Sequence, residues 1–211
     1  MIQPQIAHVI NLVSATEPSD LVVAQPITIE TMRVAREFAR ETKTAKVGLF
    51  AVQLHDEQAV ALPECFVRLP ALARSVVDIR DFAFPRKLPL IRDILDALFS
   101  ASDSDYFVYS NVDIALMPNF FTTVARIIEK GHDAFAINRR TISNRYREPA
   151  EIPLMYSELG EKHQGWDCFV FKRSVYPRFR LGNACIGAGW FGRVMLTNLA
   201  CLAGSFKIFT D

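Results

Sequence analysis

Short apolar runs alternate with amphipathic stretches through the first 138 residues, and this alternation restricts the possible folds more than any other feature of the sequence. The apolar runs have the length of strands, whereas the stretches between them repeat apolar residues every three or four positions, as a helix face does. This order predicts an α/β domain with helices on both faces of a mostly parallel, Rossmann-like sheet. We expect strands at residues 7–13, 47–54, 106–115 and 133–138, and helices at residues 27–40, 87–99 and 119–130.

The pattern changes after residue 140. Residues 141–162 are polar and irregular, and after them we expect a strand at 166–172, a helix at 192–202 and a strand at 206–209. These elements extend the same sheet, so we expect a single domain over residues 1–211. The sequence stops at Asp211, directly after the last expected strand, and we therefore expect that a C-terminal portion is missing.

Charge and hydropathy exclude several classes of protein. Lys and Arg number 24 against 23 Asp and Glu, a net charge of +1, whereas a dedicated nucleic-acid binder carries a marked basic excess. No apolar run reaches the length of about 18 residues that a transmembrane helix needs, and the N-terminus does not resemble a signal peptide. The four cysteines form no C-x-x-C pair, so we expect reduced thiols in a cytoplasmic protein.

Polar residues stand at the ends of the expected strands, where ligands bind in open parallel sheets. Asn11 lies at the end of the first strand, Asp56 follows the second, and Asn111 and Asp113 lie near the end of the third. Residues two apart in a strand project from the same face. A carboxylate beside an amide oxygen suits a hard divalent cation that also binds phosphate oxygens. The spacing also fits a strand-to-turn junction in which Asn and Asp bond the local backbone.

The segment Asn111-Val112-Asp113, followed by Pro118 at the start of a helix, resembles the metal-binding segment of glycosyltransferases with the GT-A fold. In that family a strand ends in D-x-D, or in a variant such as N-x-D, and a proline-started helix follows. The resemblance covers most of the chain in order. Its other short motifs are Val9-Ile10-Asn11-Leu12 in the first strand, the basic pair Arg86-Lys87, and the acceptor-side motifs Gly165-Trp166-Asp167 and Gly187-Ala188-Gly189-Trp190.

The resemblance implies a glycosyltransferase that transfers a sugar from a nucleotide-sugar donor to an acceptor hydroxyl, assisted by Mg²⁺ or Mn²⁺. Residues 1–140 would bind the donor, residues 141–211 would bind a carbohydrate-type acceptor, and Asp113 would be the metal ligand. The chain departs from the family pattern where Asn111 replaces the first acid, and no acid follows Trp190. A downstream metal-binding histidine would lie beyond residue 211. The expected substrate-binding residues are Asn11, Asp56, Lys87, Asn111, Trp166 and Trp190.

Asp167 is the candidate catalytic base. An inverting transfer needs a carboxylate that takes the proton of the acceptor hydroxyl. Asp167 follows Trp166, whose apolar ring face can stack on a sugar. In the alternative interpretation Trp166 packs in the core and Asp167 caps a backbone group or pairs with an arginine, and a retaining transfer needs no such base.

Two other functions compete with glycosyl transfer. A nucleotidyltransferase should have glycines and basic residues directly after the first strand, and residues 14–20 contain neither. A non-catalytic nucleotide- or sugar-binding domain stays open, because the acids expected at position 111 and after Trp190 are absent. Four arginines beyond the fourth strand either bind an anionic group or form a solvated loop: Arg139, Arg140, Arg145 and Arg147.

Overall fold

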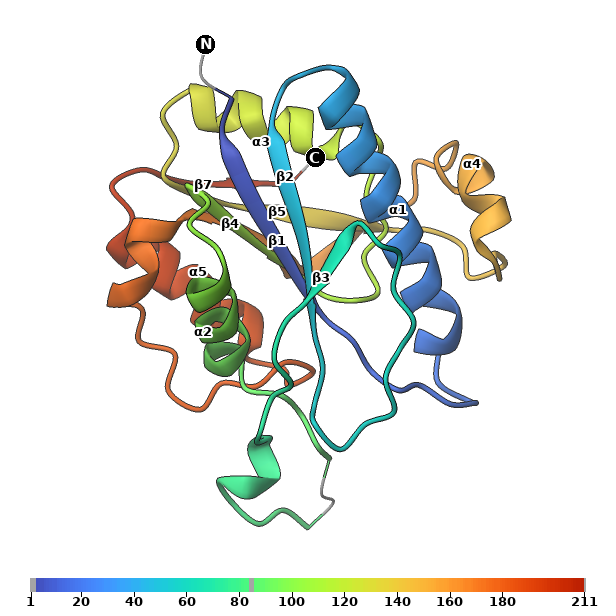
Figure 1. The fold of residues 1–211 in the computed structure, drawn as a ribbon, viewed down its shortest axis with the longest axis vertical. Coiled ribbons are helices and arrows are strands. Elements are labelled where there is room, and N and C mark those ends of the chain that lie inside the picture. Colours follow the sequence, from blue (N-terminus) through green and yellow to red (C-terminus); the bar gives the residue numbers. More distant parts are fainter. Residues whose placement is uncertain (1–2, 84–85, 211) are drawn as a thin grey trace.

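The computed structural model describes residues 3–83 and 86–210 as one seven-stranded sheet with helices on both faces (Figure 1). Pairing along the sheet makes six strands parallel, and β6 alone among the described strands runs antiparallel to its two neighbours. The expected α/β fold with a mostly parallel sheet is confirmed. The strand order is β3 (Phe66–Arg68), β2 (Lys46–Val52), β1 (Gln5–Asn11), β4 (Tyr106–Ser110), β6 (Glu161–Lys172), β5 (Ala134–Thr141) and β7 (Phe206–Phe209).

The helices form two layers because the central strands β1 and β4 bury both of their faces. On β1, Ile6 and Ile10 pack with α1 (Leu21–Glu41) and α3 (Phe120–Glu129), whereas Ala7 and Val9 pack with α2 (Ile91–Ala101) and α5 (Phe191–Leu202). Alternate residues of one strand therefore serve opposite layers. The remaining elements are short: η1 (Val76–Asp78), η2 (Pro149–Glu151), α4 (Ile152–Met155) and η3 (Arg173–Arg178).

The strand order places several chain segments at one edge of the sheet. The chain passes from β1 to β2 on one side of β1, and β4 pairs with the other side. In open parallel sheets ligands usually bind at such a reversal, beside the carboxyl ends of the two strands. Because β6 runs antiparallel, its first residues lie at the same edge as the last residues of β4 and β5.

Several boundaries differ from the sequence prediction. β4 ends at Ser110, so Asn111 and Asp113 lie in the following turn and not on one face of a strand. This correction has a simple cause, since Asn and Asp side chains favour turns. The helix expected from residue 87 begins at Ile91, and Lys87 precedes it in a loop, because Pro89 disfavours helical conformation in the residue before it.

Other elements agree with the prediction or extend it. The expected helix at 27–40 is present and starts earlier, at Leu21, while β7 has the expected bounds. Gly131, at φ +88°, follows α3 as the expected helix-ending glycine. The short strand β3 was not predicted. Asp211, after which we expected further chain, lies outside the described residues.

Two findings bear on the class of protein. Within residues 3–83 and 86–210, no helix combines the length and the hydrophobicity that crossing a bilayer requires. All four cysteines are free, as expected for reduced thiols: Cys65, Cys168, Cys185 and Cys201.

Candidate active site

Charged and polar side chains from β4, β5 and β6 meet at the carboxyl edge of the sheet. Asn111, directly after β4, donates from Nδ2 to Asp167 Oδ1 at 3.0 Å, and its backbone N–H donates to the Asp167 carbonyl at 3.1 Å. The Arg139 guanidinium lies 3.4 Å from Asp113 Oδ2 and 3.3 Å from Asp167 Oδ2. Asn111, Asp113, Arg139 and Asp167 are hereafter called the edge cluster.

An irregularity in the pairing of β5 with β6 brings Asp167 and Arg139 together. Ile137 pairs with Cys168 and Asn138 pairs with Trp166, so Asp167 is an additional residue on β6. A second register shift falls between Asn138 and Arg140, at the position of Arg139. Bulges of this kind re-aim side chains that regular pleating would send elsewhere. The position of the edge cluster thus depends on two local departures from ideal strand pairing.

The Asp167 carboxylate is held in a partly buried position with unequal oxygens. Oδ1 accepts the hydrogen bond from Asn111, whereas Oδ2 is buried and accepts no hydrogen bond. Burial raises the pKa of Asp167, and the Arg139 charge opposes that rise. Oδ2 also lies 3.3 Å from Arg139 Nε, so this carboxyl group combines a raised pKa, which suits a general base, with an ion pair.

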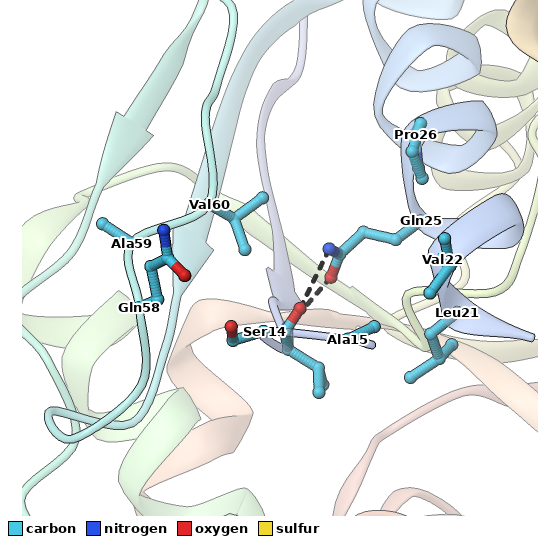
Figure 2. A pocket seen from close by; sticks show the side chains of 10 residues that line it. Ser14, Ala15, Leu21, Val22, Gln25, Pro26, Gln58, Ala59 and Val60 are labelled. Carbon is cyan, nitrogen blue, oxygen red and sulfur yellow. Dashed lines mark hydrogen bonds between the residues drawn. The ribbon is translucent and has the colours of Figure 1, made fainter. Parts of the chain in front are cut away.

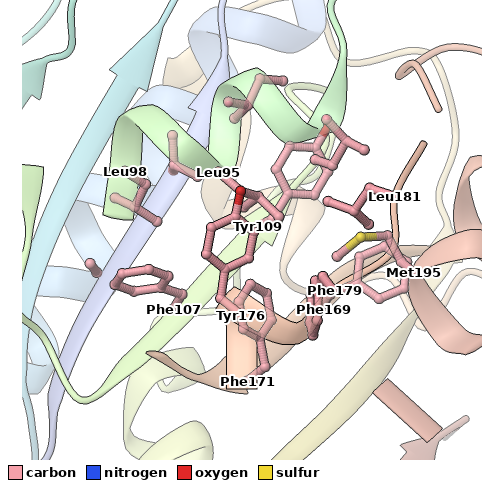
Figure 3. Close-up of a cluster of buried hydrophobic side chains, with 14 of the residues drawn as sticks. Leu95, Leu98, Phe107, Tyr109, Phe169, Phe171, Tyr176, Phe179, Leu181 and Met195 are labelled. Carbon is pink, nitrogen blue, oxygen red and sulfur yellow. The ribbon is translucent and has the colours of Figure 1, made fainter. Parts of the chain in front are cut away.

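The edge cluster is continuous with the core beneath it. Tyr109 is fully buried, and its hydroxyl donates to Asn111 Oδ1 at 3.0 Å. Its ring packs edge-on against Phe191 of α5, within the apolar cluster between the sheet and α2 and α5 (Figure 3). Because its Oδ1 accepts from Tyr109, the amide of Asn111 has a defined orientation with Nδ2 toward Asp167.

The donors at this edge suit a divalent cation only in part. Asp113 is exposed and offers carboxylate oxygens, which are ligands that Mg²⁺ and Mn²⁺ accept together with substrate phosphates. In the part of the chain that the structure describes, no three His, Cys, Asp or Glu side chains come together as a metal site. Asp113 alone is less than a protein metal site needs, so an ion bound here would take most of its ligands from a substrate.

A pocket of about 260 Å³ lies at the same edge of the sheet, beyond the end of β1 (Figure 2). Gln25 of α1 forms its wall by pairing with Val13: Val13 N–H donates to Oε1 at 2.9 Å, and Nε2 donates to the Val13 carbonyl at 3.1 Å. Glu57 accepts from the Ser14 N–H at 3.0 Å. The lining is Val13, Ser14, Ala15, Leu21, Val22, Gln25, Pro26, Gln58, Ala59 and Val60.

The structure separates the other predicted site residues. Asn11 is buried at the end of β1, where Nδ2 donates to the neighbouring Leu12 carbonyl at 3.1 Å. Asp56 and Lys87 form an exposed ion pair with each other, and Lys87 holds the pKa of Asp56 below its ordinary value. Their roles in substrate binding stay predictions.

The two tryptophans differ in exposure. Trp166 is partly buried against the core and its Nε1 has no hydrogen-bond partner, whereas the Trp190 side chain is 67% exposed. The Arg193 guanidinium lies 4.6 Å from the centre of the Trp190 ring. Gly192 allows close approach of α5 to β6, because a Cβ there would lie 3.0 Å from the Trp166 carbonyl oxygen.

Sequence reasoning did not single out Arg139, Gln25 or Glu57. Arg139 was one of four arginines in a polar stretch, and only the irregular pairing of β5 distinguishes it from Arg140, which bonds the carbonyls of Leu159 and Gly160. Gln25 lies on the buried face of an amphipathic helix, where a polar residue in an apolar stripe was the available signal.

Comparison with known proteins supports the fold. No protein-family model matches the chain, and no curated protein matches its sequence. Among solved structures, Staphylococcus aureus TarS (residues 1–349) superposes with a TM-score of 0.58 at 7% identity, covering 98% of this chain and 58% of the TarS chain. The chain therefore spans less than two thirds of that protein fragment.

Two further solved structures have lower scores. The bifunctional IspDF of Campylobacter jejuni has a TM-score of 0.49 at 10% identity, with 98% of this chain and 50% of that chain covered. Glucosyl-3-phosphoglycerate synthase of Mycobacterium tuberculosis, solved with Mn²⁺, UDP-glucose and phosphoglyceric acid, has a TM-score of 0.49 at 13% identity, with 97% and 70% covered. The chain has a GT-A-like fold, and this assignment rests on the likeness to TarS.

Proposed function

We propose that this protein is a nucleotide-sugar-dependent glycosyltransferase. The observation that carries the proposal is the edge cluster: two carboxylates and a guanidinium meet within 3.4 Å contacts at the carboxyl edge of a GT-A-like sheet. A fold hosts many functions, so the site and not the fold must support an activity. Asp113 is exposed, whereas Asp167 is partly buried and has a raised pKa. Carboxylates with such different environments at one site mark a candidate site for chemistry.

The donor is proposed to bind across residues 1–140. The pocket beyond β1 offers an apolar wall and the polar groups of Ser14 and Gln25, which suits the nucleoside part. Asp113, at the end of β4 on the other side of the topological reversal, would face the diphosphate. A bound Mg²⁺ or Mn²⁺ would supply positive charge to the leaving diphosphate, and Asp113 would be its protein ligand.

The acceptor is proposed to bind on the side of residues 141–211. Trp190 is exposed, and an exposed indole face can stack on a sugar ring. Asp167 would accept the proton of the attacking hydroxyl; its Oδ2 forms no hydrogen bond in this structure and lies 3.3 Å from Arg139 Nε. Trp166 and Asn111 would hold Asp167 in place, and the transfer would invert the configuration of the sugar. The four free thiols suit a reducing compartment, and we propose a cytoplasmic protein.

The test is turnover of a panel of nucleotide-sugars with Mn²⁺, measured as release of nucleoside diphosphate. We expect Asp113→Ala to abolish the metal-dependent release and leave the fold intact, because this exposed side chain contributes little to the core. Asp103→Ala is the matched control, since the Asp103 side chain is 99% exposed and precedes β4 at the opposite edge of the sheet. Equal turnover of the wild type and Asp113→Ala contradicts the assignment.

One observation favours a second candidate, a non-catalytic nucleotide- or sugar-binding domain. Both carboxylates of the edge cluster contact Arg139, and only one of them is exposed. Calorimetry distinguishes the candidates: binding of a nucleotide-sugar with no turnover under any metal and acceptor condition identifies a binding domain, whereas turnover identifies an enzyme.

A further inference from the structure

Arg139 is the cation that the edge cluster already contains. Its side chain reaches both carboxylates, with Nη1 3.4 Å from Asp113 and Nε 3.3 Å from Asp167. Nη2 also lies 3.1 Å from His163 Nε2. The guanidinium is 27% exposed, and the Asp167 side chain is 16% exposed, so water screens this pair less than a surface pair.

The contact with Asp113 engages the same carboxylate that the proposed metal would need. A divalent ion on Asp113 would lie beside the guanidinium, and the two positive charges would repel each other at close range. The ion therefore has to displace Arg139 from Asp113 or bind against its charge. Phosphate oxygens are alternative partners for the arginine fork, because guanidinium groups bind phosphate bidentately.

We propose that Arg139 is an internal counter-cation that excludes divalent metal from Asp113 until an anionic ligand draws its guanidinium away. The inference rests on the proposed function only in taking the anionic ligand to be the diphosphate of a nucleotide-sugar. Asp167 and His163 hold Arg139 in this position, and Asp113 is the carboxylate that it releases. In the donor-free protein the metal site is closed by one of the chain's own side chains.

The exclusion is testable with Mn²⁺ alone, without any nucleotide. Free Mn²⁺ is titrated into the metal-free protein and followed by its paramagnetic resonance signal, which is lost from the free ion when it binds. We expect Arg139→Gln to bind Mn²⁺ at least about tenfold more tightly than the wild type, as removal of a unit charge near a dication implies even at the dielectric constant of water. In the double variant Arg139→Gln/Asp113→Asn, the gain is lost.

Arg140→Gln is the matched control. It removes the same charge from the neighbouring position, and Arg140 bonds backbone carbonyls of Leu159 and Gly160 instead of a carboxylate. We expect its Mn²⁺ affinity to stay within about twofold of the wild type, because a solvated charge farther from the ion is screened. An equal gain in both arginine variants means a general charge effect and overturns the proposal.

A second comparison holds even where Arg139→Gln does not fold. The wild type and Asp113→Asn should bind Mn²⁺ alone equally weakly, since Asp113 is engaged by Arg139. Tighter binding by the wild type than by Asp113→Asn shows an open site and overturns the proposal, as does an unchanged affinity in a folded Arg139→Gln variant. No nucleotide-sugar enters these titrations, so the exclusion can hold in a protein without transferase activity, and can fail in one that has it.

Discussion

His8 should make the stability of this protein depend on pH in a way that one substitution removes. It lies in the middle of β1 and is fully buried, with Nε2 2.8 Å from Ser110 Oγ and no partner for Nδ1. The rings of Phe120 and Phe121 lie beside it, with centroids 6.1 and 5.8 Å away. Burial in these surroundings lowers the pKa of His8 from 6.5 to about 3.

The direction of this pH dependence follows from which state of the protein binds the proton. Between these two pKa values the unfolded chain binds a proton at His8 and the folded chain does not, so acid favours unfolding. Stability is therefore complete above the unfolded pKa and is lost as the pH falls below it. At about pH 5 the loss amounts to about 2 kcal/mol, set mainly by the unfolded pKa, and it approaches about 5 kcal/mol near the native pKa.

The assay is urea unfolding of the wild type and His8→Gln at pH 8 and about pH 5. Glutamine does not titrate and can still bond Ser110, while carboxylates and the other histidines contribute equally to both proteins. We expect the difference in unfolding free energy between the two proteins to shift by about 2 kcal/mol against the wild type at the lower pH. A difference that stays constant with pH would falsify the assignment of His8 as a neutral buried side chain.

Three further substitutions test the site and the backbone. Asp167→Asn should keep donor binding and lower turnover by about 10²–10⁴, the usual contribution of a positioned base, in steady-state kinetics; near-normal turnover would instead favour a retaining mechanism or a binding domain. Asn111→Asp should tighten Mn²⁺ binding in calorimetry. It should also lower the melting temperature of the metal-free protein, because two facing carboxylates replace the 3.0 Å hydrogen bond to Asp167. An unchanged melting temperature contradicts this. Gly160→Ala should destabilise by about 1–3 kcal/mol in urea unfolding, since φ is +62° and the new Cβ would lie 2.6 Å from the Thr141 carbonyl oxygen. Gly131→Ala, at φ +88° with no atom within 4 Å, is its control and should cost less.

Most of the fold was predictable because the strands are buried on both faces. Such strands appear in the sequence as mostly apolar runs, which is how the strands at 7–13, 47–54 and 106–115 were identified, whereas apolar residues at helical spacing identified the core face of α1. The direction of β6 and its place between β4 and β5 were not predictable. Residue periodicity reports which face of a strand is buried and carries no record of which strand lies beside it.

Three members of the edge cluster, Asn111, Asp113 and Asp167, were singled out from the sequence, whereas Arg139 and the geometry that joins the four were not. The proximity of Asn111 to Asp113 was inferred from a strand that in fact ends at Ser110, and a turn brings them to the edge instead. Asp167 pairs with an arginine, as the alternative interpretation has it, while its role as a catalytic base stays a prediction. That Arg139 is this arginine depends on bulges in β5 and β6, and their positions have no sequence signature strong enough to read in advance.

The strand order makes the two proposed functional halves inseparable as folding units. β6, from the second half of the chain, is inserted between β4 and β5 of the first half, and β7 adds beyond β5. A chain that stopped at residue 140 would leave β4 and β5 each with an unpaired apolar flank, the kind of open edge that recruits other chains. We therefore expect residues 1–140 and 141–211 to fold only together, so that neither proposed half can be replaced as an independent module.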